Sequence, residues 1–211
     1  MDSILFSAGT QRHVASEDWL YEIITGGYCA LIFDCDGTLV DSSEAHFESF
    51  KTAMRAQGYD LEREWYDQRN GLDRLSILSA LSAEVSGPLD IPLAAQQSID
   101  AFVSATNALS PIAETGKLVR SLAGTYPMAV GTNAEAQVAT ASLQAVNLFD
   151  FFVAIVSISD GFPAKPDPDI FSHATQRLGF SASKTLVFED SPEGVSAAIA
   201  AGSHVIQIDN S

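Results

Sequence analysis

The sequence predicts an α/β fold: a doubly wound parallel sheet with a helical domain inserted near its start. Short apolar runs alternate with helical patterns over the second half of the chain, as in parallel sheets that carry helices on both faces. A strand-poor stretch, residues 42–110, precedes that alternation. Polar residues recur where the apolar runs end, which is the edge at which open α/β sheets bind ligands.

Residues 1–27 stand outside this pattern as an N-terminal extension. The stretch SEDWLYEIITGG predicts a short helix that Ser16 caps and that Gly26 and Gly27 end. We expect this helix to pack on the core through three apolar side chains, which are Trp19, Leu20 and Ile23. No residue pattern supports the alternative, a role in binding a partner.

The stretch ALIFDCDGTLVDS opens the predicted core. Residues 30–33 form an apolar run of the kind found in strands that are buried on both faces. Asp34 and Asp36 follow it and share one face if the extended conformation continues, and Gly37 permits a tight turn. Taken alone, the stretch is also compatible with a solvated acidic loop.

Residues 42–110 predict three helices, within SSEAHFESFKTAMRAQG, LDRLSILSALSAEV and PLAAQQSIDAFVSATNAL. The segment is too long for a simple crossover, so we interpret it as a helical cap over the sheet. The core then comprises residues 28–41 and 111–211. In that second part, a helix at about 114–122 precedes four strands, MAVGT, FFVAIVS, TLVFE and HVIQI, each separated from the next by a predicted helix.

Polar residues follow four of the predicted strands, and parallel strands bring these ends to one edge of the sheet. They are Asp34 and Asp36, then Thr132 and Asn133, then Lys165, and finally Glu189 and Asp190. Singly, a threonine there is equally typical of a helix cap, a lysine of a surface loop, and an acid pair of a helix N-terminus. Their recurrence in order, each after a strand, favours one common site.

Such a set of residues suits phosphate chemistry. Facing acid pairs repel each other unless a cation neutralises them, and carboxylates are hard oxygen ligands for Mg²⁺, which commonly pairs with substrate phosphate. Thr132 and Lys165 can hold phosphate oxygens through a hydroxyl hydrogen bond and a compact positive charge. One carboxylate can attack phosphorus, and a second can transfer protons.

Composition limits the partners. The formal net charge of −16 opposes binding to nucleic acid and to anionic membranes, and it would repel a phosphorylated substrate unless a cation or a few local basic residues reverse the sign at the site. No apolar run is long enough to cross a bilayer, and no secretory signal is recognisable. The two cysteines, Cys29 and Cys35, are expected to be reduced thiols, so we expect a cytoplasmic protein. No pattern encodes an oligomeric state, and a monomer is favoured.

These motifs resemble those of the haloacid dehalogenase superfamily. DCDGTLVDS is similar to its first motif, GTN to its second, KPDPDIF to its third and FEDSPEGVSAA to its fourth, and the resemblance covers nearly all of residues 28–208. The position of the helical insertion resembles the cap of the β-phosphoglucomutase-like branch. Within that branch, phosphatases of the fructose 1-phosphate type look most similar.

The resemblance implies a Mg²⁺-dependent phosphatase that hydrolyses a small phosphorylated metabolite, with a sugar phosphate favoured, through an aspartyl-phosphate intermediate. Asp34 would be the nucleophile and Asp36 the general acid–base. Thr132, Asn133 and Lys165 would hold the phosphoryl group. The Mg²⁺ ligands would be Asp34, the carbonyl oxygen of Asp36, Glu189 and Asp190.

Three residues of the insertion, His46, Asn70 and Arg74, are the candidates for substrate contacts. Arg74 resembles the cap arginine with which a mutase holds a second phosphate, whereas His46 is common to both activities. Lys51 is the only lysine between Asp36 and Lys117, which leaves little charge for a second phosphate. A phosphatase is therefore favoured over a sugar phosphomutase. A noncatalytic module that binds a phosphorylated ligand is the alternative of another class.

Overall fold

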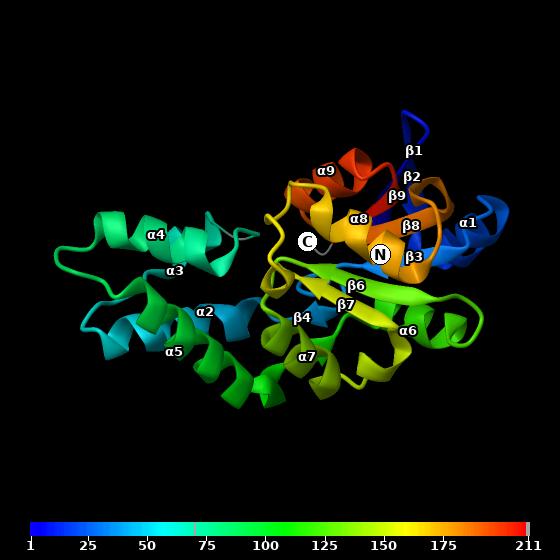
Figure 1. Ribbon diagram of the computed structural model, residues 1–211. Helices are drawn as coiled ribbons and strands as arrows, with labels where there is room; N and C mark the ends of the chain where they lie inside the picture. Colours follow the sequence, from blue (N-terminus) through cyan, green and yellow to red (C-terminus); the bar gives the residue numbers. More distant parts are fainter. Residues whose placement is uncertain (70, 210–211) are drawn as a thin grey trace.

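The computed structural model describes residues 1–69 and 71–209, and its centre is a seven-stranded sheet of order β2-β1-β9-β8-β3-β6-β7 (Figure 1). Five strands pair in parallel: β3 (Ala30–Phe33), β6 (Met128–Thr132), β7 (Ala154–Ser157), β8 (Thr185–Glu189) and β9 (His204–Ile208). These are the five strands that the sequence predicts, and the predicted fold class is confirmed.

Helices cover both faces of the sheet because its strands are apolar on both sides. On β3, Leu31 and Phe33 face one core and Ala30 and Ile32 face the other, in the two-residue alternation of a strand. The first core packs against α6 (Ala113–Leu122) and α7 (Ala136–Ala145). The second packs against α8 (Asp169–Leu178) and α9 (Pro192–Ala200), which lie on the opposite side in Figure 1.

The N-terminal segment is a β-hairpin followed by a helix, and the hairpin is absent from the sequence-based expectation. β1 (Asp2–Ser7) pairs antiparallel with β9, and β2 (Thr10–Ala15) pairs with β1 at the edge of the sheet. Ala8 and Gly9 both have positive φ, as two-residue hairpin turns require. The edge strand is exposed along most of its length, so its sequence, TQRHVA, lacks the apolar alternation that signals a strand.

Helix α1 (Trp19–Thr25) corrects two details of the expected extension. Trp19 and Ile23 are buried as expected, but Leu20 is 44% exposed, because consecutive residues of a helix face different sides. Ser16 does not cap the helix: its hydroxyl accepts from the N-terminal amine of Met1 and donates to Glu17.

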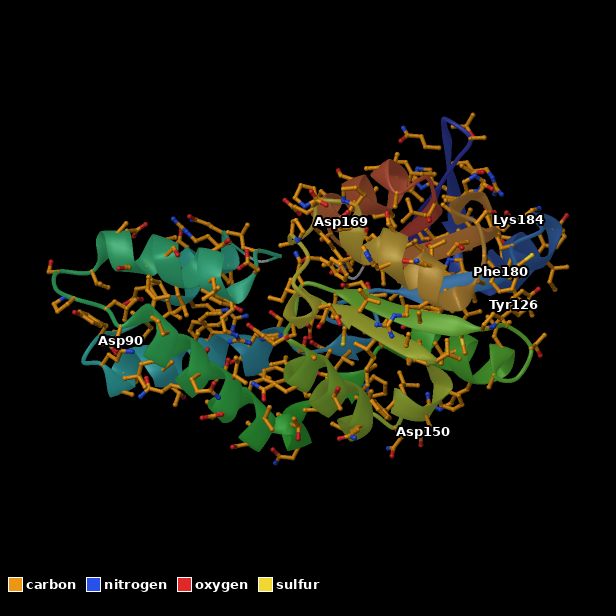
Figure 2. All side chains as sticks on the ribbon, in the orientation of Figure 1. Asp90, Tyr126, Asp150, Asp169, Phe180 and Lys184 are labelled. Carbon is orange, nitrogen blue, oxygen red and sulfur yellow. The ribbon has the colours of Figure 1, made fainter. Side chains whose placement is uncertain are left out.

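The described part of the insertion contains four α-helices, which are α2 (Ser43–Ala56), α3 (Arg63–Asp67), α4 (Arg74–Glu84) and α5 (Ile91–Ser104). The short helix α3 is additional to the three that the sequence predicts. The helices pack around their own apolar cluster, which includes Phe47, Phe50 and Leu78. Figure 2 shows Asp90 at the end of the insertion remote from the sheet, where its carboxylate caps α5.

The chain passes between sheet and insertion at a two-stranded ladder. β4 (Val40–Asp41) leaves the sheet, and β5 (Ser110–Pro111) returns beside it in antiparallel register. The ladder therefore lies at the predicted boundaries of residues 42 and 110, although the division into domains stays a prediction. Among the described residues, no helix is both long enough and apolar enough to cross a membrane.

Candidate active site

The polar residues predicted from the strand ends converge on one cavity of 620 Å³. Asp34 follows β3, Thr132 ends β6, Lys165 lies in the loop after β7, and Glu189 ends β8. Parallel pairing of these strands places all four ends on one edge, as their topology demands. Residues of the helical insertion line the opposite side of the same cavity, among them His46 and Arg74.

Lys165 lies between two carboxylates at the floor of the cavity. Its Nζ is 2.5 Å from Oδ1 of Asp34 and 2.8 Å from Oε1 of Glu189, and it lies 4.6 Å from the centre of the Phe171 ring. Burial alone would lower the pKa of Lys165, but the two carboxylates outweigh it and raise that pKa above its ordinary value. The ammonium group therefore stays charged.

The carboxyl groups around Lys165 have less opposite charge near them than the lysine has. Burial raises the pKa of Asp34 well above its usual value, and repulsion from Glu189 and Asp190 adds to this against the attraction of Lys165. Burial and Glu189 raise the pKa of Asp190 to about 7, although Thr38 donates a hydrogen bond to it at 3.2 Å. Three carboxyl groups thus share one ammonium group, which leaves an excess of negative charge.

The donor set fits a hard divalent cation. Two glycines let the backbone approach the acids closely: a Cβ on Gly37 would lie 2.2 Å from Oδ2 of Asp190, and one on Gly194 would lie 1.7 Å from Oε1 of Glu189. In the described part of the chain, no three acidic, histidine or cysteine side chains already form a metal cage. Mg²⁺ needs no preformed cage, because it usually retains several waters and completes its ligand shell with protein oxygens and substrate phosphate oxygens.

Asp36 has a different environment from Asp34. Its Oδ1 accepts a hydrogen bond from the Ser42 hydroxyl at 2.6 Å and lies 3.1 Å from Nε2 of His46, whose ring stacks on Phe102 at 4.3 Å. Burial opposes ionisation of Asp36, but His46 and then Ser42 outweigh it and hold the pKa below its usual value. The pKa of Asp34 is therefore raised and that of Asp36 is lowered, and such a difference is typical of paired catalytic carboxyl groups.

Thr132 and Asn133 lie at the same edge but make local bonds. The Thr132 hydroxyl is buried and accepts from the backbone N–H of Ala134 at 3.1 Å, which leaves its own proton free to be donated. The Asn133 side chain accepts from the backbone N–H of Lys165 at 2.8 Å and donates to the carbonyl of Lys165 at 3.5 Å. Asn133 thus holds the loop that carries Lys165.

The three candidate substrate-binding residues of the insertion differ in their positions and partners. His46 reaches Asp36 directly, so a residue of α2 touches the sheet edge. Arg74, the first residue of α4, is buried and donates from Nε to both carboxylate oxygens of Glu135, at 3.0 and 3.1 Å. Asn70 lies outside the described residues.

Three polar residues of the cavity region were missed by sequence reasoning: Thr38, Ser42 and Glu135. Thr38 and Ser42 are polar residues inside the DCDGTLVDS stretch, so their proximity to the acids was a usable signal. Glu135 comes only two residues after Asn133. Its partner Arg74 is far away along the chain, so the sequence gives no sign that the two residues pair. Each of the three forms a hydrogen bond with a residue that the sequence singled out, namely Asp190, Asp36 and Arg74 respectively.

Comparisons with known proteins identify the family and the relatives of this chain. A family model described as haloacid dehalogenase-like hydrolase matches residues 31–208. A fructose-1-phosphate phosphatase of Escherichia coli (strain K12), YqaB, is 31% identical over 182 residues, which cover 86% of this chain and 96% of that protein. A β-phosphoglucomutase of Bacillus subtilis (strain 168) is 25% identical over 187 residues, covering 85% of this chain and 82% of the relative.

Among solved structures, CbbY from Rhodobacter sphaeroides in complex with phosphate superposes with a TM-score of 0.77. The match covers 83% of this chain and 84% of CbbY at 23% sequence identity, a likeness of fold. The family-model match over residues 31–208 takes in the five parallel strands, the strand-end residues and the insertion between β4 and β5, and it leaves out the N-terminal hairpin.

Proposed function

Because this chain belongs to the haloacid dehalogenase-like hydrolases and is a phosphoric monoester hydrolase, we propose that it hydrolyses a small sugar phosphate with Mg²⁺ through an aspartyl phosphate. The observation that carries the proposal is the arrangement at the strand ends. A buried lysine holds Asp34 and Glu189, while Asp36 stands beside them in hydrogen-bond contact with Ser42 and His46.

In the first half-reaction, Asp34 attacks phosphorus and the ester oxygen leaves as an alcohol. Lys165 contacts Oδ1 of Asp34, so it can orient that carboxylate and neutralise charge on the transferring phosphoryl group. Thr132 donates its hydroxyl proton to a phosphoryl oxygen, since its acceptor side is already bonded to Ala134. Asn133 acts indirectly, by holding the backbone of Lys165.

Asp36 serves as proton donor and then as proton acceptor. The negative charge of an incoming phosphate raises the pKa of a neighbouring carboxyl, which favours the protonated form needed to release the alcohol. Once the alcohol has left, the hydrogen bonds from Ser42 and His46 favour the ionised form, which can take a proton from water. Water then attacks phosphorus of the aspartyl phosphate and regenerates Asp34.

A bound Mg²⁺ would supply the charge that neutralises phosphate oxygens as the ester bond breaks. Asp34, Glu189, Asp190 and the carbonyl oxygen of Asp36 are the groups that would hold it. Their charge supports this role, because the pKa values of Asp34 and Asp190 are raised first by burial and then by repulsion between the acids, and a divalent cation would remove that repulsion.

The helical insertion would act as a cap that excludes water while the phosphoryl group transfers. Three contacts between insertion and core support this: His46 with Asp36, Arg74 with Glu135, and Phe102 with Val138.

The domain limits that we propose are those predicted from the sequence: an N-terminal extension over residues 1–27, a core over 28–41 and 111–211, and a cap over 42–110. We also propose, as the sequence predicts, that the protein is a cytoplasmic monomer that binds neither nucleic acid nor membranes.

The second candidate is a sugar phosphomutase, which the β-phosphoglucomutase relative makes relevant. A mutase must hold a second phosphate, and Arg74 is the cavity's candidate for that task. Because Arg74 is already paired with Glu135, the arrangement favours a phosphatase.

Phosphate release from a panel of sugar and polyol phosphates tests the proposal. It should require Mg²⁺, disappear with EDTA, and disappear in Asp34→Asn, which should keep the circular dichroism spectrum of the native fold. β-Glucose 1-phosphate belongs in the panel, with glucose 6-phosphate followed separately. Glucose 6-phosphate formed with little free phosphate would instead identify a mutase, and substantial turnover by Asp34→Asn would refute the role of Asp34.

A further inference from the structure

Arg74, which is buried, and Glu135, which is partly buried, form an ion pair across the cavity. Arg74 begins α4 in the insertion, and Glu135 immediately precedes α7, close to the end of β6. Nε of Arg74 donates to both oxygens of Glu135, and the two side chains are only 4% and 17% exposed. The pair thus joins the two sides of the site.

The guanidinium group of Arg74 is held on two further sides. Nη1 donates to the hydroxyl of Ser98 at 2.8 Å, and the group lies 4.9 Å from the centre of the Phe50 ring. A guanidinium fixed in this way cannot turn toward a second anion without breaking bonds to Glu135 or Ser98. Its charge is also matched already by Glu135, so a second anion would meet a neutral pair.

The charges that line the cavity also disfavour the binding of a second anion. Two basic side chains, Arg74 and Lys165, face seven acidic ones among the described lining residues. The acidic residues are Asp34, Asp36, Asp41, Glu135, Glu189, Asp190 and Glu193. Lys165 contacts Asp34 and Glu189, where it serves the transferring phosphoryl group rather than a second phosphate on the remainder of the substrate. Even with a divalent cation present, the remaining acidic excess disfavours any further negative group on the substrate.

We propose that Glu135 is a specificity-determining residue: it occupies Arg74, so that the site accepts a monophosphate with an uncharged remainder and rejects one with a second phosphate. This inference rests on the proposed phosphatase function and names its substrate class. Hydroxyl groups suit the remainder of the substrate, since Glu135 and Asp41 both line the cavity and carboxylates accept hydrogen bonds. Removing the charge of Glu135 would free Arg74 to bind a second phosphate.

Binding measured without turnover tests this directly. In an Asp34→Asn background with Mg²⁺, calorimetry gives the dissociation constants of fructose 1-phosphate and fructose 1,6-bisphosphate, which differ only in the second phosphate. Adding Glu135→Gln keeps the size of the side chain and an oxygen acceptor for Arg74. We expect the ratio of bisphosphate to monophosphate affinity to rise at least tenfold, and to fall back when Arg74→Gln is added as well.

Glu193→Gln is the matched control, because Glu193 lines the same cavity and forms no ion pair with any described residue. An equal shift in that variant would overturn the proposal in favour of a general charge effect. An unchanged ratio in Glu135→Gln would also overturn it, and would leave the ion pair as a link between insertion and core. A shifted ratio in a protein whose Asp34 form releases no phosphate from any ester of the panel would uphold this inference and refute the phosphatase. Failure of both fructose esters to bind would overturn this inference, and phosphate release from the panel would decide the proposed function separately.

Discussion

At the scale of single residues, the charge balance of the site depends on Lys165. Its ammonium group contacts Asp34 and Glu189, and all three side chains are buried. Charges removed from water are costly unless each has a partner at short distance. The two acids are thus held in place by one cation, and the same cation is available to a phosphoryl group that approaches Asp34.

Replacing Lys165 tests this balance. Lys165→Met fills similar space without charge and leaves two buried carboxylates facing each other, so the free energy of unfolding should fall by about 3–5 kcal/mol. Urea unfolding in EDTA at neutral pH measures the loss. Lys117→Met, at an exposed site on α6, should change stability by no more than about 0.5 kcal/mol. Equal stability of the two variants would show that the acids are not held by Lys165.

Sequence reasoning reached some of these residues and missed others for a physical reason. Asp34, Lys165 and Glu189 each follow a strand, and parallel pairing is enough to bring such positions together. Glu135 also follows a strand, but its partner Arg74 lies on a helix of the insertion. How that insertion sits on the sheet depends on packing that no local pattern encodes, so the pairing of the two charges required the structure.

At the scale of elements, the N-terminal hairpin and α1 complete one side of the sheet. β1 pairs with β9, and Trp19 packs edge-on against Phe188 of β8 with ring centres 5.3 Å apart. The indole N–H of Trp19 donates to the hydroxyl of Ser3 at 2.9 Å. One side chain therefore ties the helix to both the hairpin and the core.

Two neighbouring residues of α1 allow a matched test of this packing. Trp19 is 1% exposed, so Trp19→Ala should lower the free energy of unfolding by about 3–5 kcal/mol. Leu20 is 44% exposed, so Leu20→Ala should change it by no more than about 0.5 kcal/mol. Urea titrations followed by circular dichroism measure both. Similar losses from the two substitutions would mean that α1 does not dock as described.

The docking of the hairpin on β9 also predicts a pH dependence. Nδ1 of His204 on β9 lies 3.1 Å from the Ser7 hydroxyl and 2.7 Å from the Tyr28 hydroxyl, and burial lowers the pKa of His204. The folded state therefore prefers the neutral ring. Its stabilising contribution is present above about pH 6.5, the ordinary value for histidine, and decreases as the pH falls below it.

A comparison with His204→Gln isolates this contribution from the many carboxylates of the chain. Between about pH 7.5 and 5.5, the wild-type protein should lose more stability than the variant, because glutamine does not titrate. The measurement is urea unfolding of both proteins at the two pH values. Parallel losses would show that His204 does not change its protonation on folding.

The sequence predicts the five parallel strands and the helices between them, and it misses the hairpin. Buried strands such as β8 contain a continuous apolar run, here residues 186–188, a signal that can be read without knowledge of the neighbouring strands. β2 lies at an edge and exposes most of its residues, so its pairing with β1, rather than its composition, makes it a strand. Edge elements of this kind are defined by tertiary contact.

At the scale of the whole molecule, the site exists only where sheet and insertion meet. The sheet provides the acids and Lys165, and the insertion provides His46 and Arg74 on the other side of the cavity. The chain crosses between the two parts at β4 and β5. A net charge of −16 surrounds this cavity, so a phosphorylated substrate depends on a cation at the site itself to offset repulsion by the rest of the molecule.

The central claim is that phosphoryl transfer passes through Asp34, and trapping the intermediate tests it most directly. The protein is mixed with a sugar phosphate that it hydrolyses, with Mg²⁺, and is quenched in acid within one turnover. Mass spectrometry of the peptide containing Asp34 should show the added mass of one phosphoryl group, removable by hydroxylamine and absent in Asp34→Asn. Rapid phosphate release with no phosphorylated peptide, or with the group on another residue, would contradict the account.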